Sequence, residues 1–101
     1  MRGITITYSY DGDEAIWRSA IAAFITAIEA DPDIAGKFVY QVAVADDGKT
    51  RIHWGRWDST DTLTHLQSQP YFKTFASSIK DFAGGPPTAT GHDVTQKTTG
   101  W

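Results

Sequence analysis

Apolar and polar side chains alternate along several short segments of this chain. In residues 4–10 (ITITYSY), apolar or aromatic side chains alternate with hydroxyl-bearing ones, and residues 37–45 (KFVYQVAVA) and 50–57 (TRIHWGRW) have the same period of two. Asp47-Gly48, between the last two segments, is typical of a tight hairpin turn. The pattern predicts four strands, the last of them short: residues 4–10, 37–45, 50–57 and about 88–96.

An apolar stripe with helical spacing follows the first predicted strand. Its members recur every three or four residues: Trp17, Ile21, Phe24 and Ile28. Asp11 and Glu14 stand at the spacing of a capping box, so we expect the helix to begin there. Pro32 disfavours helical backbone at Asp31, and we expect the helix to end near Ala30.

A second helical pattern follows residue 57. Asp58 or Ser59 can cap it, Pro70 suits the first turn of a continuing or a new helix, and Gly84-Gly85 ends it. The apolar members of this pattern are Leu63, Leu66, Phe72, Phe75, Ala76, Ile79 and Phe82.

The element order β-α-β-β-α-β is that of a ferredoxin-like α+β fold, with an antiparallel sheet and both helices on one face. We expect one domain over residues 1–101, with residues 96–101 as a C-terminal tail whose apolar anchor is Trp101. The second predicted strand is apolar on both sides, because Val39 and Ala43 alternate with aromatic and aliphatic neighbours. Because one helix layer covers one face, the pattern predicts a homodimer in which two sheets pack together.

Composition narrows the class of protein. The formal net charge is −3 and the nine basic residues are scattered, so we expect no nucleic-acid partner. There is no cysteine, which excludes disulfides, thiol catalysis and cysteine-based metal sites. The first ten residues lack the apolar region of a signal peptide, and the longest mainly apolar stretch, 15–30, is short for a membrane span. We therefore expect a soluble, cytoplasmic protein without a membrane partner.

Two segments resemble a known family. RWDSTDTLTHLQSQPYFKTF (56–75) and GGPPTATGHDV (84–94) are similar to the antibiotic biosynthesis monooxygenase (ABM) group of the dimeric α/β-barrel superfamily. The resemblance implies a dimeric α/β barrel that oxidises an aromatic or polyketide-like small molecule, such as an anthrone, without a cofactor in an interior cavity. Other members of the superfamily imply two alternatives: a non-catalytic small-molecule-binding or stress-associated dimer, and a polyketide cyclase or isomerase.

The resemblance also indicates candidate site residues. Some relatives carry Asn-x-x-x-Trp on the third strand, where this chain has His53 and Trp57. His53 would be the base or the hydrogen-bond donor to a developing oxyanion. Trp57 and Phe72 would be aromatic walls and His65 a second polar group. For Trp57 and His65 a packing role is the alternative.

Strand alternation supports part of this site. His53 and Trp57 share one face of the third strand, and Gly55 between them leaves space for a flat ligand. We expect Thr5 and Thr7, on the polar face of the first strand, to line the same site.

We expect neither a metal nor another cofactor. The three histidines lack the close spacing of paired metal ligands. In haem-degrading relatives, a tryptophan stands at the position of His65, the axial histidine falls near Phe75 and Ala76, and an asparagine falls within residues 5–7. This sequence has none of these residues at those positions.

Overall fold

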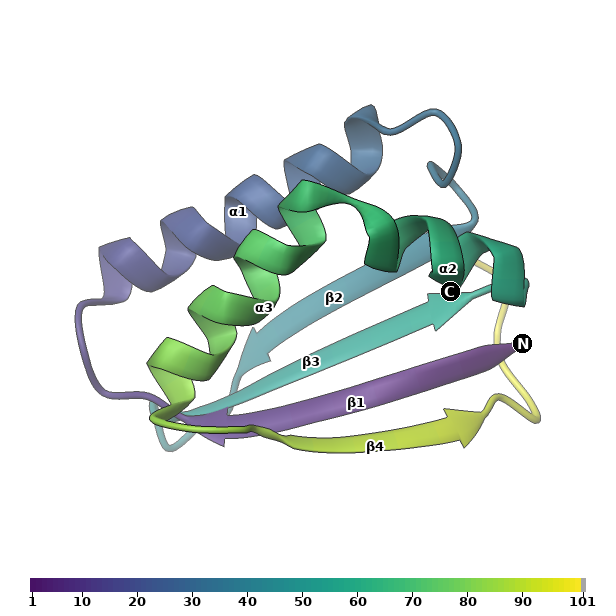
Figure 1. The fold of residues 1–101 in the computed structure, drawn as a ribbon. Coiled ribbons are helices and arrows are strands. Elements are labelled where there is room, and N and C mark those ends of the chain that lie inside the picture. The colour runs from purple at the N-terminus through teal and green to yellow at the C-terminus, as the bar shows by residue number, and fades with distance from the viewer. Residues whose placement is uncertain (101) are drawn as a thin grey trace.

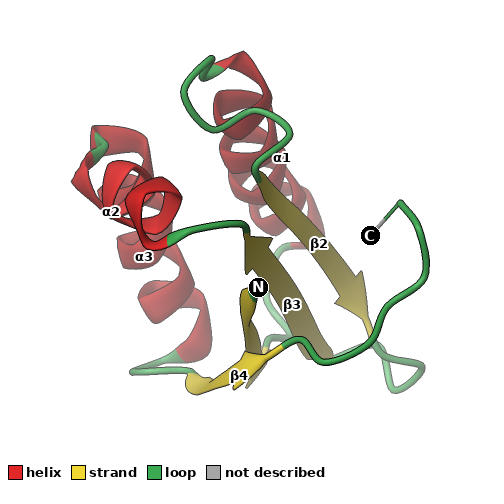
Figure 2. Ribbon diagram, turned by 90° about the vertical axis from the view of Figure 1, so that its right-hand side faces the viewer, coloured by secondary structure: helices red, strands yellow, loops and turns green. Residues whose placement is uncertain are grey.

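A computed structural model describes residues 1–100 of the chain as one four-stranded antiparallel sheet with three helices (Figure 1). The strand order is β2-β3-β1-β4, and all three helices lie on the same face of the sheet (Figure 2). The elements are β1 (Arg2–Ser9), α1 (Glu14–Ala30), β2 (Phe38–Val44), β3 (Thr50–Trp57), α2 (Thr60–Ser68), α3 (Pro70–Ala83) and β4 (Thr88–Asp93). The predicted ferredoxin-like α+β fold is confirmed.

Local chemistry explains where the helices begin and end. The N-cap of α1 is Asp13 rather than the predicted Asp11, because the Asp13 carboxylate accepts a hydrogen bond from the backbone N–H of Ile16 at 3.0 Å. The second predicted helix is split into α2 and α3. Gln69 is extended (φ −82°, ψ 140°), as expected of a residue that precedes a proline. Gly84 ends α3 in the left-handed conformation (φ 73°).

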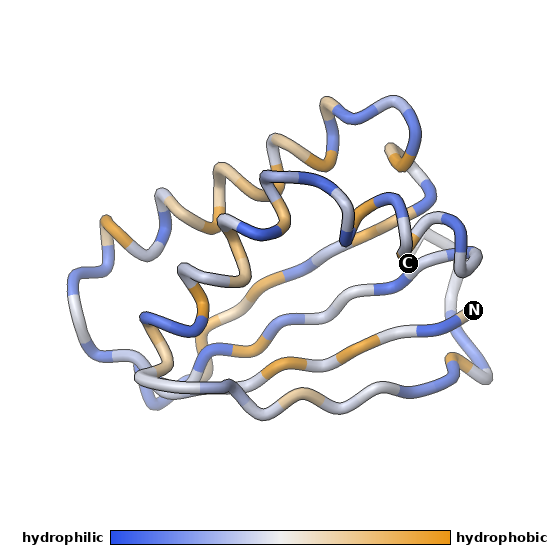
Figure 3. The backbone as a smooth tube through the Cα atoms, viewed as in Figure 1, coloured by the Kyte–Doolittle hydropathy of each residue, from blue (hydrophilic) through white to orange (hydrophobic). Residues whose placement is uncertain are grey.

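The core lies between the sheet and the helices. Hydrophobic positions are separated by hydrophilic or neutral ones along α1 and β1 (Figure 3), and the predicted stripe of α1 is buried as expected. The rings of Phe24 on α1 and Phe75 on α3 stack with centroids 3.8 Å apart and planes within 5°. This stack joins the two long helices directly above the sheet.

The opposite face of the sheet is partly covered by the chain itself. β4 ends at Asp93, earlier than the predicted residue 96, and the segment after it runs along this outer face (Figure 2). Gln96 and Lys97 of that segment line a groove of about 410 Å³ together with Trp54. Trp101 lies outside the described residues. Among the described helices, none is long and apolar enough to cross a membrane.

The burial pattern of α1 generates a stability prediction. Ile21 is 9% exposed and Ile16 is 61% exposed on the same helix. We expect Ile21→Ala to lower the free energy of unfolding by about 2–5 kcal/mol, because it removes buried methyl groups and leaves a cavity. Ile16→Ala is the control and should change it by less than about 0.5 kcal/mol. Urea denaturation measures both, and equal losses would contradict the assignment of the buried face.

Candidate functional site

A cavity of about 500 Å³ lies between the helices and the sheet. Its walls are almost wholly apolar and are formed by Ile4, Ile6, Phe24, Phe38, Tyr40, Trp57, Leu63, Leu66, Gln67, Phe72, Phe75, Ala76, Ile79, Lys80, Pro86 and Pro87. Trp57 and Phe72, both predicted as aromatic walls, are among them.

Small residues on the edge strand explain part of this space. The positions of β4 paired with Ile6 and Ile4 are Ala89 and Gly91. These inward positions therefore carry little side-chain volume, and the cavity is left open beside β1.

His53 lies behind the cavity wall rather than on it. Its side chain is fully buried (0% exposed) between two tyrosines. The Tyr8 hydroxyl is 2.8 Å from His53 Nε2, and the Tyr40 hydroxyl is 2.8 Å from His53 Nδ1. The indole N–H of Trp17 donates to the Tyr8 hydroxyl at 2.9 Å. Of these four side chains, Tyr40 is the one that lines the cavity.

Burial keeps this network uncharged near neutral pH. It lowers the pKa of His53 to about 4, because the imidazolium would lose its hydration without gaining a counter-charge. Burial also raises the pKa of Tyr8 and, more strongly, that of Tyr40. The histidine is therefore a neutral ring with one donor and one acceptor nitrogen.

Donor and acceptor counting gives the network a direction. The Trp17 indole can only donate, so the buried Tyr8 oxygen accepts from it. We assign the Tyr8 hydrogen to His53 Nε2, because a buried hydroxyl without an acceptor is costly and Tyr8 (8% exposed) is more deeply buried than the half-buried Tyr40. His53 then carries its proton on Nδ1 and donates it to the Tyr40 oxygen. In this arrangement the network does not use the hydroxyl hydrogen of Tyr40, a residue that lines the cavity.

The surrounding rings hold Tyr40 in one orientation. It meets Phe24 and Phe75 edge to face, at interplanar angles of 87° and 86°. Its other side lies against β3 at Gly55, where an added Cβ would stand 3.2 Å from two Tyr40 ring atoms. Gly55 therefore makes room for the tyrosine ring, whereas the sequence had suggested that it makes room for a ligand.

A buried arginine completes the far end of the network. Arg51 is 1% exposed, and its guanidinium lies 4.4 Å from the centroid of the Trp17 ring. Its Nη1 bonds the Glu14 carboxylate at 2.8 Å, and its Nη2 donates to the Tyr10 carbonyl at 3.0 Å. The sequence pattern did not indicate this role, although Arg51 shares a strand face with His53.

Thr5 and Thr7 do not line this site, and that expectation is wrong. β1 pairs with β3 so that Ile6 stands opposite His53 and Thr5 opposite Trp54. The threonines therefore lie on the outer face, where the Thr5 hydroxyl is 3.3 Å from His92 Nε2.

His65 is also separate from the cavity. Its Nε2 lies 2.9 Å from the Asp31 carboxylate, to which the Tyr71 hydroxyl also donates at 2.8 Å. These bonds tie α2 and α3 to the loop after α1. Asp31, Asp33 and His65 bring one potential metal ligand each to within 4.8 Å of one another. The Asp31–His65 contact is satisfied without an ion, and the absence of a bound metal stays a prediction.

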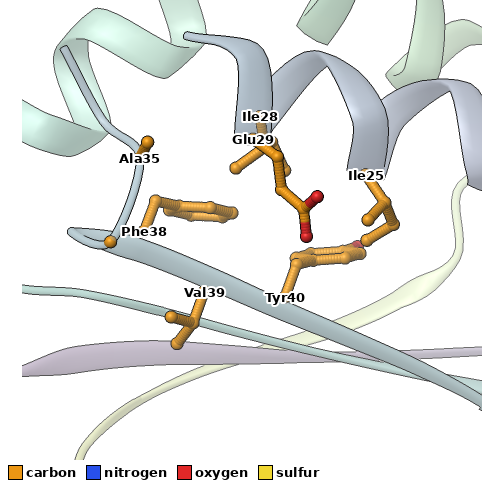
Figure 4. A pocket seen from close by; sticks show the side chains of 8 residues that line it. Ile25, Ile28, Glu29, Ala35, Phe38, Val39 and Tyr40 are labelled. Atoms are coloured by element: carbon orange, nitrogen blue, oxygen red, sulfur yellow. The ribbon is translucent and has the colours of Figure 1, made fainter. Parts of the chain in front are cut away.

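A smaller groove of about 260 Å³ lies between α1 and the edge strand β2. Figure 4 shows the rings of Phe38 and Tyr40 on the α1 side of β2, and Val39 on the other side. Glu29 extends from α1 toward Tyr40 in the same view. Phe38 and Tyr40 line both hollows, so they form the wall between them.

The fold is shared with solved structures, some of which are named as antibiotic biosynthesis monooxygenases. Rv0793 from Mycobacterium tuberculosis matches with a TM-score of 0.78 and 15% identity over 97% of this chain and 98% of its own. SnoaB, a cofactor-independent oxygenase from Streptomyces nogalater, matches with a TM-score of 0.75 and 15% identity over 97% and 96%. A candidate antibiotic biosynthesis monooxygenase from Nitrosomonas europaea matches with a TM-score of 0.76 and 10% identity over 95% and 100%.

These similarities confirm the sequence resemblance at the level of the fold. No family model matches the sequence, and no curated protein does. At such low identities the fold alone is established, so activity must be argued from the site.

The buried imidazole generates a prediction about pH. The pKa of His53 is about 4 in the folded state and near 6.5 when the chain is unfolded. Between these values the unfolded chain binds a proton that the native chain does not, so stability falls as pH falls from about 6.5 to 4. We expect His53 to contribute on the order of 3 kcal/mol to this loss.

Urea denaturation of the wild type and of His53→Gln between pH 7 and 4 measures this contribution. The wild type should lose more stability than the variant, because the other titrating groups are common to both. Parallel curves would contradict the assignment.

Proposed function

We propose that the cavity binds an aromatic or polyketide-like small molecule and that the protein is a cofactor-independent monooxygenase. One observation carries this proposal: the hydrogen bonds that join Trp17, Tyr8 and His53 end at Tyr40, a residue of the apolar cavity wall. With the proton of His53 on Nδ1, the Tyr40 hydroxyl is a donor to the ligand. Such a donor stabilises an oxyanion that develops on a bound phenol or ketone, because it is already oriented when the charge forms. The name of SnoaB, a protein of the same fold, supports this reaction type.

The chemistry requires no electron source besides the substrate. A methylene carbon next to an aromatic ketone loses a proton to water, and the negative charge is delocalised onto the ketone oxygen, where Tyr40 donates. The carbanion transfers an electron to O₂, and the two radicals combine to form a C–O bond. Protonation gives a hydroperoxide, which loses water to leave a carbonyl. One oxygen atom of O₂ enters the product and the other enters water.

In this proposal His53 is a positioning residue rather than the base expected from the sequence. It is enclosed by Tyr8, Tyr40 and Phe75, and its low pKa makes it a weak proton acceptor. It fixes the Tyr40 oxygen and leaves the hydroxyl hydrogen for the substrate. Trp57 and Phe72 are the proposed aromatic walls that hold a flat substrate.

Non-catalytic binding of the same ligand class is the second candidate. A specific observation favours it: among the described residues, no carboxylate and no imidazole lines the cavity. The proton acceptor must then be water, which suits a substrate that is already acidic.

Oxygen consumption with 1,8-dihydroxyanthrone tests the reaction. We expect one O₂ per quinone formed above the autoxidation background, and Tyr40→Phe should lower kcat by roughly 10²-fold, because it deletes the oxyanion donor. His65→Ala is the matched control and should retain activity, since its ring contacts Asp31 outside the cavity. Binding of the anthrone without oxygen uptake would favour the second candidate. Full activity of Tyr40→Phe would contradict the assigned donor.

We further propose a homodimer that packs through the outer face of the sheet. On this face β2 and β3 carry the apolar side chains of Val39, Ile52 and Trp54 beside the polar ones of Gln41 and Arg56. The outer positions of β1 and β4 are more polar, with two threonines on each strand and His92 on β4. A stable dimer buries about 800 Å² per partner.

Sedimentation equilibrium at micromolar concentration tests the dimer. We expect twice the mass of the 11.1 kDa chain, and a shift toward the monomer in Trp54→Glu, because a charge would be buried at the interface. Ile16→Glu, on exposed helix surface, is the control and should leave the mass unchanged. A monomeric wild type would refute the proposed assembly.

A further inference from the structure

Lys80 is the one charged side chain among the described residues that line the cavity. It is exposed and lies in the last turn of α3, one residue after the buried Ile79. The Gln67 amide of α2 is the other exposed polar group of the lining. The cavity therefore has an apolar interior and a cationic, hydrogen-bonding rim.

The Lys80 ammonium is not neutralised within residues 1–100, because no carboxylate there lies within 4.0 Å of it. Among those residues the cavity lining also lacks an acidic side chain that would repel an anion. Both features are present in a chain with a formal net charge of −3. The charge at the rim is therefore positive, whereas the net charge of the protein is negative.

The apolar interior restricts where a charged ligand group can lie. An ionised carboxylate taken inside would lose its hydration and find only the neutral Tyr40 hydroxyl and the Trp57 indole as polar partners. At the rim, the same group keeps part of its water and faces Lys80. The cavity thus distinguishes the two ends of an amphiphilic ligand.

We infer that the ligand is an organic anion, with a flat apolar body inside the cavity and a carboxylate or a similarly acidic oxygen beside Lys80. This inference rests on the proposed ligand-binding role of the cavity. It adds a substrate class and an orientation: the reacting ketone or phenol lies at Tyr40, and the anionic end lies at Lys80. Lys80 then determines specificity and takes no part in the reaction.

Binding of two nearly isosteric probes tests this inference without turnover. Isothermal titration calorimetry at low ionic strength gives the affinities of 2-naphthoate, an anion, and of 2-naphthamide, its neutral counterpart. We expect Lys80→Gln to lower the ratio of naphthoate to naphthamide affinity by about 3- to 10-fold, an effect that salt should weaken. Comparing ratios cancels the different hydration of the two probes.

Lys73→Gln is the matched control. Lys73 lies on the same helix, seven residues before Lys80 and thus on nearly the same side, but it does not line the cavity. This variant should keep the wild-type ratio, as should Lys80→Arg, which preserves the charge. Thermal unfolding verifies that each variant is folded.

The outcomes separate this inference from the proposed function. An unchanged ratio in Lys80→Gln overturns the anion assignment and leaves the cavity as a binding site. If Lys73→Gln lowers the ratio of naphthoate to naphthamide affinity as much as Lys80→Gln does, the effect comes from general surface charge. That result also overturns the anion assignment. Failure of both probes to bind the wild type overturns this inference together with ligand binding by the cavity. If the protein binds the probes but consumes no oxygen with the anthrone, the affinities predicted here for naphthoate and naphthamide are unchanged.

Discussion

The site depends on one constraint, the need of the buried His53 ring to satisfy both of its nitrogens. The ring is fully buried, and tyrosine hydroxyls 2.8 Å away supply both partners. Trp17 can only donate to Tyr8. Assigning the hydrogen of the buried Tyr8 to His53 Nε2 then orders the network in one direction. The order ends at Tyr40, which is the one member of the network on the cavity wall.

This constraint links the core to the proposed chemistry. The aromatic packing of Phe24 and Phe75 stabilises the fold and also fixes the ring of Tyr40. The small residue at Gly55 allows that ring to lie against β3. A hydroxyl held in this way loses little entropy when a ligand binds, which is the condition for effective oxyanion stabilisation. In the proposed orientation the opposite end of the ligand lies beside Lys80, the charged residue of the described cavity lining.

The sequence predicted the elements well, because their signals are local. The spacing of Trp17 and Ile21 identified the buried face of α1, and Asp47-Gly48 identified the hairpin between β2 and β3. The sequence did not decide whether one helix or two cover this region, because Pro70 fits the first turn of a continuing or a new helix. In the structure Gln69, the residue before Pro70, is extended, so α2 ends there and α3 begins as a new helix.

The site was harder to predict, because it depends on contacts between distant segments. The period of two in β1 separates its faces but does not say which face meets His53, and Thr5 was assigned to the wrong one. His65 was expected near the cavity, but a hydrogen bond to Asp31, 34 residues earlier, holds it elsewhere. Tyr8 and Tyr40 appeared only as members of strand patterns. The requirement that a buried tyrosine hydroxyl find a partner was a signal that could have connected them to His53.

The protonation state of His53 tests the account most directly. Long-range ¹H–¹⁵N correlation spectra of the protein with ¹⁵N-labelled histidine distinguish the two neutral tautomers from the imidazolium, and His53→Gln assigns the signal. The account predicts a neutral ring at pH 7 with its proton on Nδ1, facing Tyr40. A proton on Nε2, or a charged ring, would reverse or abolish the direction of the hydrogen bonds and contradict the proposed role of Tyr40.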